Sequence, residues 1–393
     1  MDETYAAPKA AARRWTWRIP AYILLPFYLM LIGVALRYAV YVRTTGHFGF
    51  SDYLRSLCVY DCNAYERLAL YGYENRPSGF DKGDANNWAF FPFYSILTWA
   101  IAKATGLSIL VAGSIFTCLT TVWAAIVAWP LFDGKFRAYF FFCAFLFLGP
   151  ASYYFSTLYT EALFILLTCA GFVLLKDKNY VAAGATGALM SATRSTGLLF
   201  AAAILIAAFQ NHLKEGGTVG GFFRTLWKRT DLLLAVALVP IGICLFAIYL
   251  WFHSGDALAF VHIQRAWGRA FADPFNNLWL SLKLQFETYH NYSSISTDLA
   301  FALAAIAGMA LSAVMAWKGR WDWAIFSLFG VLLPLSTNTY SMIRFVCGLA
   351  PILITGAVLG ARWKWVFYLL LPAFLILDIF WLPTWIGRSY YMM

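Results

Sequence analysis

Residues 19–42 read IPAYILLPFYLMLIGVALRYAVYV, and this stretch decides the class of fold. The run is long enough to cross about 30 Å of hydrocarbon as one α-helix, in which the backbone polar groups bond to one another. It is too long for the apolar core of a signal peptide, and no small-residue cleavage site follows it. We therefore expect it to be retained as a first membrane helix.

Apolar runs of similar kind recur along the whole chain. Of its 393 residues, 62% are hydrophobic and 12% are charged, and the mean hydropathy is +0.66. A soluble domain of this composition would expose large apolar patches. We predict an all-α, polytopic transmembrane protein with about eleven spans, forming a single domain over residues 1–393. After the first run, the expected spans are 109–131, 138–153, 158–175, 180–193, 196–210, 231–252, 298–317, 323–337, 344–361 and 363–384.

The basic residues predict the orientation of these spans. Lysine and arginine favour the cytoplasmic side of a membrane, and the N-terminal segment is rich in them. The N-terminus is therefore expected in the cytoplasm, and two long loops, 43–108 and 253–297, on the outer face. The formal charge of +10 is spread over short loops, so topology explains it better than nucleic-acid binding does. The N-terminal basic residues are Lys9, Arg13, Arg14 and Arg18.

The apolar run 91–104 is too short to span, and we expect it to lie as a juxtamembrane helix in the outer interface. Pro92 is expected to start this helix and to hold Phe91 extended. Phe91 and Tyr94 belong to an aromatic cluster that either forms an interfacial belt or stacks on a sugar or prenyl chain. Trp267, in the second long loop, is a further candidate for such stacking.

The cysteines predict no metal site. Five lie singly in apolar runs, as small core residues do. Cys58 and Cys62 are four residues apart in the first outer loop, where a local disulfide can form, and no second pair of ligands lies nearby. Walker, Rossmann and GxSxG motifs are absent, and so is an internal repeat of the kind found in secondary transporters.

Most remaining ionisable residues fall on the predicted outer face, which indicates a working site there. Asp61 is expected to cap a helix that Gly72 ends, and it is also placed to act as a general base near the membrane surface. Glu66 lies on another face of that helix, so we expect it to be a solvated or paired charge with only a minor part in the function. Glu161 starts a span, where it either gains from the helix dipole or assists in an acceptor site.

Four arginines are candidates for binding a phosphate. Arg194 lies at the tip of a short hairpin and needs an anion, either Glu161 or a donor phosphate. Arg265 and Arg269 lie in an amphipathic stretch that suits either lipid headgroups or a phosphate clamp. Arg344 begins a span, where it either snorkels to the interface or joins Arg194 at the phosphate.

These motifs resemble the GPI mannosyltransferase II (PIG-V-like) family and its bacterial relatives, within the C-type glycosyltransferase superfamily. The resemblance covers about 60 to 350. The residues that carry it are Asp61, Tyr65, Ala69 and Gly72-Tyr73, then Phe90–Tyr94, Tyr159-Thr160-Glu161 with Leu163-Phe164, Thr193–Gly197, Gln264 with Trp267-Gly268-Arg269, and Arg344-Phe345.

The resemblance implies the C-type glycosyltransferase fold and an inverting, metal-independent transfer of a sugar, mannose in the best-known members, from a polyprenyl-phosphate donor to a glycolipid or glycan. Asp61 would be the general base. Glu161, Tyr65 and Glu66 would bind the acceptor or assist. Arg194, Arg269 and Arg344 would stabilise the leaving phosphate. No cofactor beyond the lipid donor is expected.

Compact loops and a single sequon at Asn291 favour a bacterial inner membrane, with the endoplasmic reticulum as the alternative. A transporter or lipid flippase is the main competing function, and it would require ionisable residues distributed through the bilayer in both halves. A polytopic acyltransferase that uses His262 or His290 is a weaker one.

Overall fold

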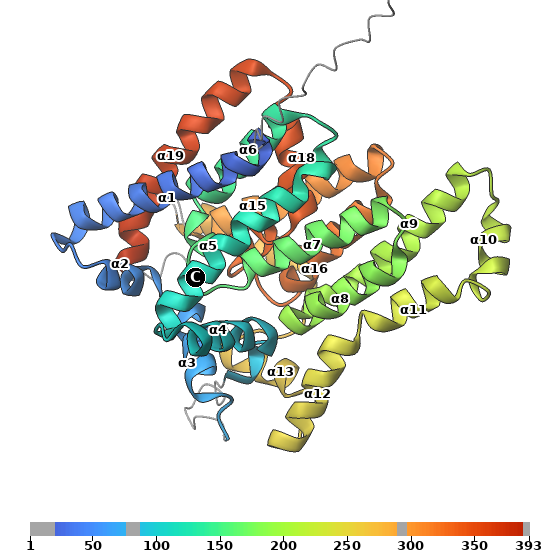
Figure 1. Ribbon diagram of the computed structural model, residues 1–393, viewed down its shortest axis with the longest axis horizontal. Coiled ribbons are helices and arrows are strands. Elements are labelled where there is room, and N and C mark those ends of the chain that lie inside the picture. Colours follow the sequence, from blue (N-terminus) through green and yellow to red (C-terminus); the bar gives the residue numbers. More distant parts are fainter. Residues whose placement is uncertain (1–19, 76–86, 289–296, 388–393) are drawn as a thin grey trace, which may run out of the picture.

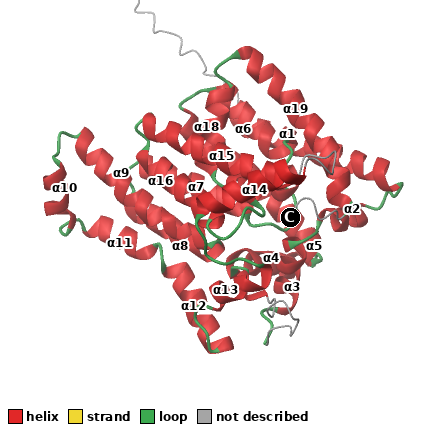
Figure 2. Ribbon diagram, turned by 180° about the vertical axis from the view of Figure 1, so that it is seen from behind, coloured by secondary structure: helices red, strands yellow, loops and turns green. Residues whose placement is uncertain are grey.

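The computed structural model describes residues 20–75, 87–288 and 297–387, and over these residues the chain is all-α (Figure 1). Seen from behind, the described residues likewise form only helices and loops (Figure 2). Three features used in the sequence predictions lie outside the described residues. They are the basic residues near the N-terminus, His290 and the sequon at Asn291.

The helices follow one another with short connections. The α-helices are α1 (Ala21–Thr45), α2 (Phe50–Leu57), α3 (Asp61–Tyr71), α4 (Pro92–Thr105), α5 (Ile109–Ala128), α6 (Phe136–Leu148), α7 (Glu161–Lys176), α8 (Tyr180–Thr193), α9 (Phe200–Lys214), α10 (Val219–Leu226), α11 (Thr230–Leu238), α12 (Ile241–Ser254), α13 (Ala259–His262), α14 (Pro274–Thr288), α15 (Thr297–Trp317), α16 (Trp321–Leu335), α17 (Met342–Cys347), α18 (Ala350–Gly360) and α19 (Lys364–Ile386). The 3-10 helices are η1 (Asn87–Ala89), η2 (Trp129–Phe132), η3 (Ser152–Phe155), η4 (Ser195–Leu199) and η5 (Ile263–Trp267).

Within the described residues, six helical segments are long and apolar enough to cross a membrane, by length and composition. This is the pattern of a multi-pass membrane protein. Shorter apolar helices accompany them, including α6, α16 and α18, and the total of about eleven spans stays a prediction. The six segments are Ala21–Thr45, Ile109–Phe132, Ser195–Lys214, Thr230–Ser254, Asp298–Trp317 and Lys364–Ile386.

The expected span 344–361 is not one continuous helix in the structure. Helix α17 ends at Cys347 and α18 begins at Ala350, and the expected span 231–252 is likewise divided between α11 and α12. Leu349 is the N-cap of α18 and is extended, with φ −99° and ψ 98°. Pro351 occupies the first turn of α18, where its missing N–H is tolerated. The break leaves Arg344 on a short helix of its own.

The first outer loop contains the juxtamembrane helices that the sequence predicts. Helix α4 begins at Pro92, after an extended Phe91, and ends at Gly106, which has φ 72°. It packs on α3, α5 and α8. Helices α3, α4 and α13 lie together at the bottom of Figure 1, whereas α10 lies at its right-hand edge, beyond α9 and α11. Helix α14, which also belongs to an expected outer loop, crosses the middle of the bundle (Figure 2).

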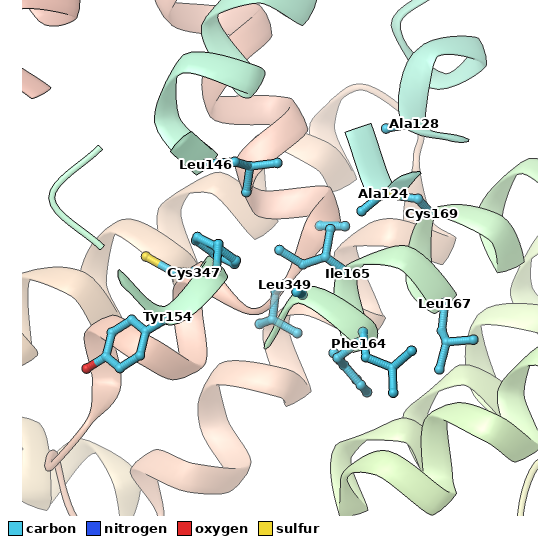
Figure 3. Close-up of a cluster of buried hydrophobic side chains, with 14 of the residues drawn as sticks. Ala124, Ala128, Leu146, Tyr154, Phe164, Ile165, Leu167, Cys169, Cys347 and Leu349 are labelled. Carbon is cyan, nitrogen blue, oxygen red and sulfur yellow. The ribbon is translucent and has the colours of Figure 1, made fainter. Parts of the chain in front are cut away.

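Small residues allow the central helices to approach closely. A Cβ added at Gly184 of α8 would lie 2.3 Å from the carbonyl oxygen of Ala235, and one at Gly242 of α12 would lie 2.2 Å from that of Ala188. Such close contacts are how helices associate in membranes, where apolar burial gives little driving force. Elsewhere in the core, buried apolar side chains from α5, α6, α7 and the α17–α18 segment pack together, with Ala124 and Ala128 of α5 beside larger residues such as Ile165 and Leu349 (Figure 3). This packing fixes the helix ends that carry the polar residues described next.

Candidate functional site

Asp61 is the first residue of α3. The residue before it, Tyr60, has φ 53° and ψ −123° and forms the N-cap, so the expectation that Asp61 itself caps the helix is wrong. Gly72, with φ 74°, ends the helix as predicted. The Asp61 side chain is 37% exposed, and it accepts a hydrogen bond from Nη1 of Arg344. Arg344 therefore holds this carboxylate, which is still partly exposed.

Glu161 begins α7, and its side chain is fully buried. Its Oε1 accepts hydrogen bonds from Nη1 of Arg194, at 2.8 Å, and from Nε of Arg344. Its Oε2 is also buried and has no hydrogen-bond partner among the described residues. A buried acceptor without a donor is costly, so this oxygen is a natural position for a hydroxyl or a water molecule.

Arg344 joins the two carboxylates. It lies on the short helix α17, which follows Ser341 in the left-handed region at φ 66°. Its guanidinium contacts Asp61 and Glu161 and lies over the Tyr159 ring, with 5.0 Å to the ring centroid. Arg344 is buried and ion-paired, so it does not snorkel to the interface; its role at a donor phosphate stays a prediction.

Arg194 occupies the break between α8 and η4, where its backbone is extended at φ −155° and ψ 144°. The expectation that it pairs with Glu161 is confirmed, at 2.8 Å. Its guanidinium also lies over Phe164 and Phe345, at 5.7 and 5.3 Å from the ring centroids. Aromatic faces and a carboxylate are the surroundings in which a buried guanidinium is stable.

Arg269 approaches the same cluster from the second outer loop. Gly268, at φ 65°, reverses the chain after η5, and the Arg269 guanidinium lies 5.5 Å from the centroid of Phe345. Burial lowers the pKa of Arg269, Asp61 raises it, and Arg344 and Arg194 lower it further. No ion pair joins Arg269 to a carboxylate in the described part of the chain. The cluster therefore holds more guanidinium than carboxylate charge, which suits an anion.

Two predicted site residues lie elsewhere. Glu66 pairs with Arg55 of α2, through two hydrogen bonds, one of them 2.8 Å long. It therefore braces α3 and does not belong to the Asp61 cluster. Arg265 is exposed on η5 and makes no ion pair with a described residue, so the structure does not bring it to Arg269.

The predicted aromatic residues take supporting positions. Phe91 is buried against Phe246 and Phe260, and the Tyr94 hydroxyl shares a 2.6 Å hydrogen bond with Thr117. Neither ring offers an open face for stacking, which corrects that expectation. Tyr65 is buried beside Tyr94, and burial raises its pKa to about 12. Trp267 ends η5, and its side chain lies outside the described residues.

Cys58 and Cys62 form a disulfide that encloses Asp61 in sequence. Both sulfur-bearing residues are fully buried. The sequence analysis gave this disulfide only as one that can form, and the structure contains it.

A buried polar cluster was not predicted from the sequence. Arg37 of α1 donates to Oγ of Ser152, at 2.8 Å, and Ser152 donates to Oδ1 of Asp378 on α19, at 2.9 Å. Both charged residues are almost completely buried. The only signal in the sequence was one charge inside each of two apolar runs.

An apolar cavity of about 560 Å³ lies between α3, α4, α8 and α12, and none of the cluster's charged residues lines it. Ala192, two residues before Arg194, forms part of its wall. Across residues 20–75, 87–288 and 297–387, no group of three or more histidine, cysteine or acidic side chains is arranged to hold a metal ion. The other residues that line the cavity include Leu68, Tyr73, Ile96, Trp99, Leu245 and Phe246.

No protein-family model matches the chain, and no curated protein matches it significantly. The assignment to the PIG-V-like family therefore stays a prediction. Among solved structures, the chain is similar to the Archaeoglobus fulgidus oligosaccharyltransferase in complex with zinc and sulfate, with a TM-score of 0.49 and 12% identity over 92% of this chain and 53% of that one.

Two further crystal structures of that oligosaccharyltransferase give similar values. The form tethered to an acceptor peptide has a TM-score of 0.47 and 12% identity, covering 94% of this chain and 55% of that one. The apo form has a TM-score of 0.48 and 12% identity, covering 96% and 57%. The chain thus spans just over half the length of the structures it matches, and similarity at this level does not establish a shared activity.

Proposed function

We propose that the chain is an inverting glycosyltransferase of the C-type superfamily, which transfers a sugar, mannose in our proposal, from a polyprenyl-phosphate donor to a glycolipid or glycan acceptor. Residues 1–393 would act as one transmembrane domain, with the loops 43–108 and 253–297 forming the active-site face. The membrane would be a bacterial inner membrane, with the N-terminus in the cytoplasm and the site on the periplasmic face.

One observation carries this proposal. Asp61, partly open to solvent, and Glu161, with a buried oxygen left over, meet three guanidinium groups at one end of the bundle. The carboxylates can accept the proton of an acceptor hydroxyl, and the excess guanidinium charge can stabilise the negative charge of a departing phosphate.

The reaction follows from these roles. An acceptor hydroxyl attacks the anomeric carbon of the sugar and gives its proton to Asp61, while the bond from that carbon to the phosphate oxygen breaks. The polyprenyl phosphate leaves with the bonding electron pair, and the anomeric configuration inverts. Arg344 orients the Asp61 carboxylate, and Oε2 of Glu161 is placed to accept a hydrogen bond from the acceptor.

Arg269 is our first candidate for the donor phosphate. Arg344 and Arg194 already share Glu161, so their charge is partly balanced, whereas no described carboxylate pairs with Arg269. The guanidinium of Arg344 pairs with both carboxylates and takes the place of a cation between them. We propose accordingly that transfer needs no metal or other cofactor.

The apolar cavity supports a substrate with a hydrocarbon chain. Its lining is aliphatic and aromatic, and it reaches Ala192, close to Arg194. In our proposal the prenyl chain of the donor lies in this cavity and its phosphate reaches the guanidinium groups past Ala192.

The disulfide supports the proposed side of the membrane. Structural disulfides persist in oxidising compartments such as the periplasm or the lumen of the endoplasmic reticulum, and are rare in the cytosol. Cys58 and Cys62 flank Asp61, so the site and the disulfide share a compartment.

Transfer of labelled sugar from synthetic polyprenyl-phosphate mannose by the purified protein, in detergent with acceptor glycolipids, tests the proposal. We expect activity that survives EDTA and falls at least about 100-fold in Asp61→Asn, since a general base contributes about 10²–10⁴ in rate. Glu66→Gln, which lies on the same helix outside the cluster, is the matched control and should stay active. Equal activity of wild type and Asp61→Asn would remove Asp61 from its role. No transfer from any lipid-linked sugar would favour a flippase.

A further inference from the structure

The last helix, α19, contacts the rest of the protein through one narrow stripe. Its buried side chains are Asp378, Leu382 and Trp385, spaced by four and three residues and so on one face of the helix. Trp365, near its other end, is 69% exposed, whereas Trp385 is fully buried. The buried end of this stripe lies at the candidate site.

One side of the Trp385 indole holds the segment that precedes Asp61. The indole Nε1 donates a hydrogen bond of 3.0 Å to the carbonyl oxygen of Leu57. The ring meets that of Tyr60 edge to face, with centroids 5.3 Å apart. Tyr60 is the residue directly before Asp61, so its placement sets where α3 begins.

The other side of the indole holds the segment that precedes Glu161. The ring stacks on Tyr153 at 4.0 Å and meets Tyr154 at 5.4 Å. Tyr154 in turn contacts Tyr159, whose hydroxyl donates to the carbonyl oxygen of Val59 at 2.8 Å. One indole therefore links the two segments that lead into the two carboxylates.

The turn before Asp61 needs such support. Tyr60 has φ 53°, in a region that residues other than glycine rarely occupy, and such a conformation persists only when its surroundings hold it. The Cys58–Cys62 disulfide closes the same turn from within. Trp385 and the disulfide thus restrain one backbone segment by independent means.

We propose that Trp385 is a positioning residue for Asp61, and that it acts together with the Cys58–Cys62 disulfide to hold the carboxylate at its working distance from Arg344. The inference rests on the proposed function, because it takes Asp61 as the general base. A displacement of about 1 Å in such a group can cost on the order of 100-fold in rate, so an enzyme that uses Asp61 depends on this turn.

The test compares Trp385→Phe with Trp365→Phe, and the double variant Cys58→Ser/Cys62→Ser with Cys244→Ser. Trp385→Phe keeps an aromatic ring and removes the hydrogen bond to Leu57. We expect it to lower kcat about 10-fold and to shift the pH at which kcat is half-maximal, with the KM for the lipid donor unchanged. The double serine variant should act in the same direction and more strongly. Both controls, an exposed tryptophan on the same helix and an exposed free cysteine, should behave as wild type.

Hydrogen exchange of the full-length protein supplies a readout that does not need activity. Loss of positioning should speed exchange of the amides of Cys62 and Asn63, which donate to Val59 and Tyr60, more than exchange elsewhere. Unchanged exchange in both site variants overturns the inference, and so does a wild-type kcat and pH profile per folded molecule. If wild type transfers no sugar but Trp385→Phe still loosens this turn, the proposed function fails and the structural part of the inference stands.

Discussion

Arg194 and Arg344 donate to the same oxygen, Oε1 of Glu161, although they lie 150 residues apart in the sequence. One buried carboxylate therefore anchors two of the three guanidinium groups of the site. Only Arg344 continues to Asp61. Glu161 consequently connects α7, α8 and α17, and its loss would disturb all three at once.

Replacing Glu161 with glutamine should destabilise the protein strongly. The substitution leaves two guanidinium groups without their shared counter-charge, and breaking a buried pair in this way costs about 3–5 kcal/mol. Thermal unfolding in detergent measures the effect, and Glu66→Gln provides the comparison, since the partner of Glu66 is half-exposed. Equal unfolding temperatures for the two variants would contradict the central place given to Glu161.

Replacing Arg269 with methionine should weaken donor binding without weakening the fold. Its guanidinium has no described carboxylate partner to leave behind, and a charged hydrogen bond to a phosphate contributes about 1.5–3 kcal/mol. We therefore expect the KM for the donor to rise roughly 10- to 100-fold. Arg265→Met, a change at an exposed position, should leave it unaltered. A large loss of thermal stability in Arg269→Met would show a structural role instead.

Arg37 and Asp378 should behave as a coupled pair. Either Arg37→Met or Asp378→Leu alone leaves one charge buried among apolar helices, at a cost of about 3–5 kcal/mol. The double variant removes both charges and should be more stable than either single one. A double-mutant cycle on thermal unfolding measures the coupling, and strictly additive effects would show that the two residues do not communicate through Ser152.

Tyr65 predicts part of the response to alkaline pH. Its pKa is raised by burial to about 12 in the folded protein, from 10.0, so its contribution is complete below pH 10 and is lost as the pH rises toward 12. Each pH unit in this window costs about 1.4 kcal/mol for this group. Tyr65→Phe should make the fall in the free energy of unfolding between pH 10 and 12 less steep, and thermal melts across that range measure this slope. An unchanged slope would mean that other buried tyrosines account for it.

The membrane helices and several site residues could be predicted because their signals are local. Hydropathy depends only on neighbouring residues, and Pro92 and Gly72 mark helix ends by their own backbone preferences. Arg194 could be assigned an anionic partner because a charge in a short hairpin must be balanced wherever it lies.

Other features could not be predicted because they depend on contacts between distant segments. Nothing near Asp378 or Trp385 in the sequence indicates Ser152 or Leu57, which lie 226 and 328 residues away. In the sequence, Asp378 and Trp385 are isolated residues of an apolar run. The stacking expected of Phe91 and Tyr94 is wrong for a similar reason, since an aromatic cluster looks the same in the sequence whether it faces a ligand or neighbouring helices.

The separation between Asp61 and Arg344, 283 residues, has a consequence for biogenesis. At about 5–20 residues per second, a ribosome needs roughly 14–57 s to travel that distance. During this interval Asp61 has been made and its arginine has not, whereas Cys58 and Cys62 are already neighbours. The order of synthesis thus gives the disulfide time to close before α17 and α19 arrive, and a chain that ends before α17 would carry a carboxylate with no counter-charge.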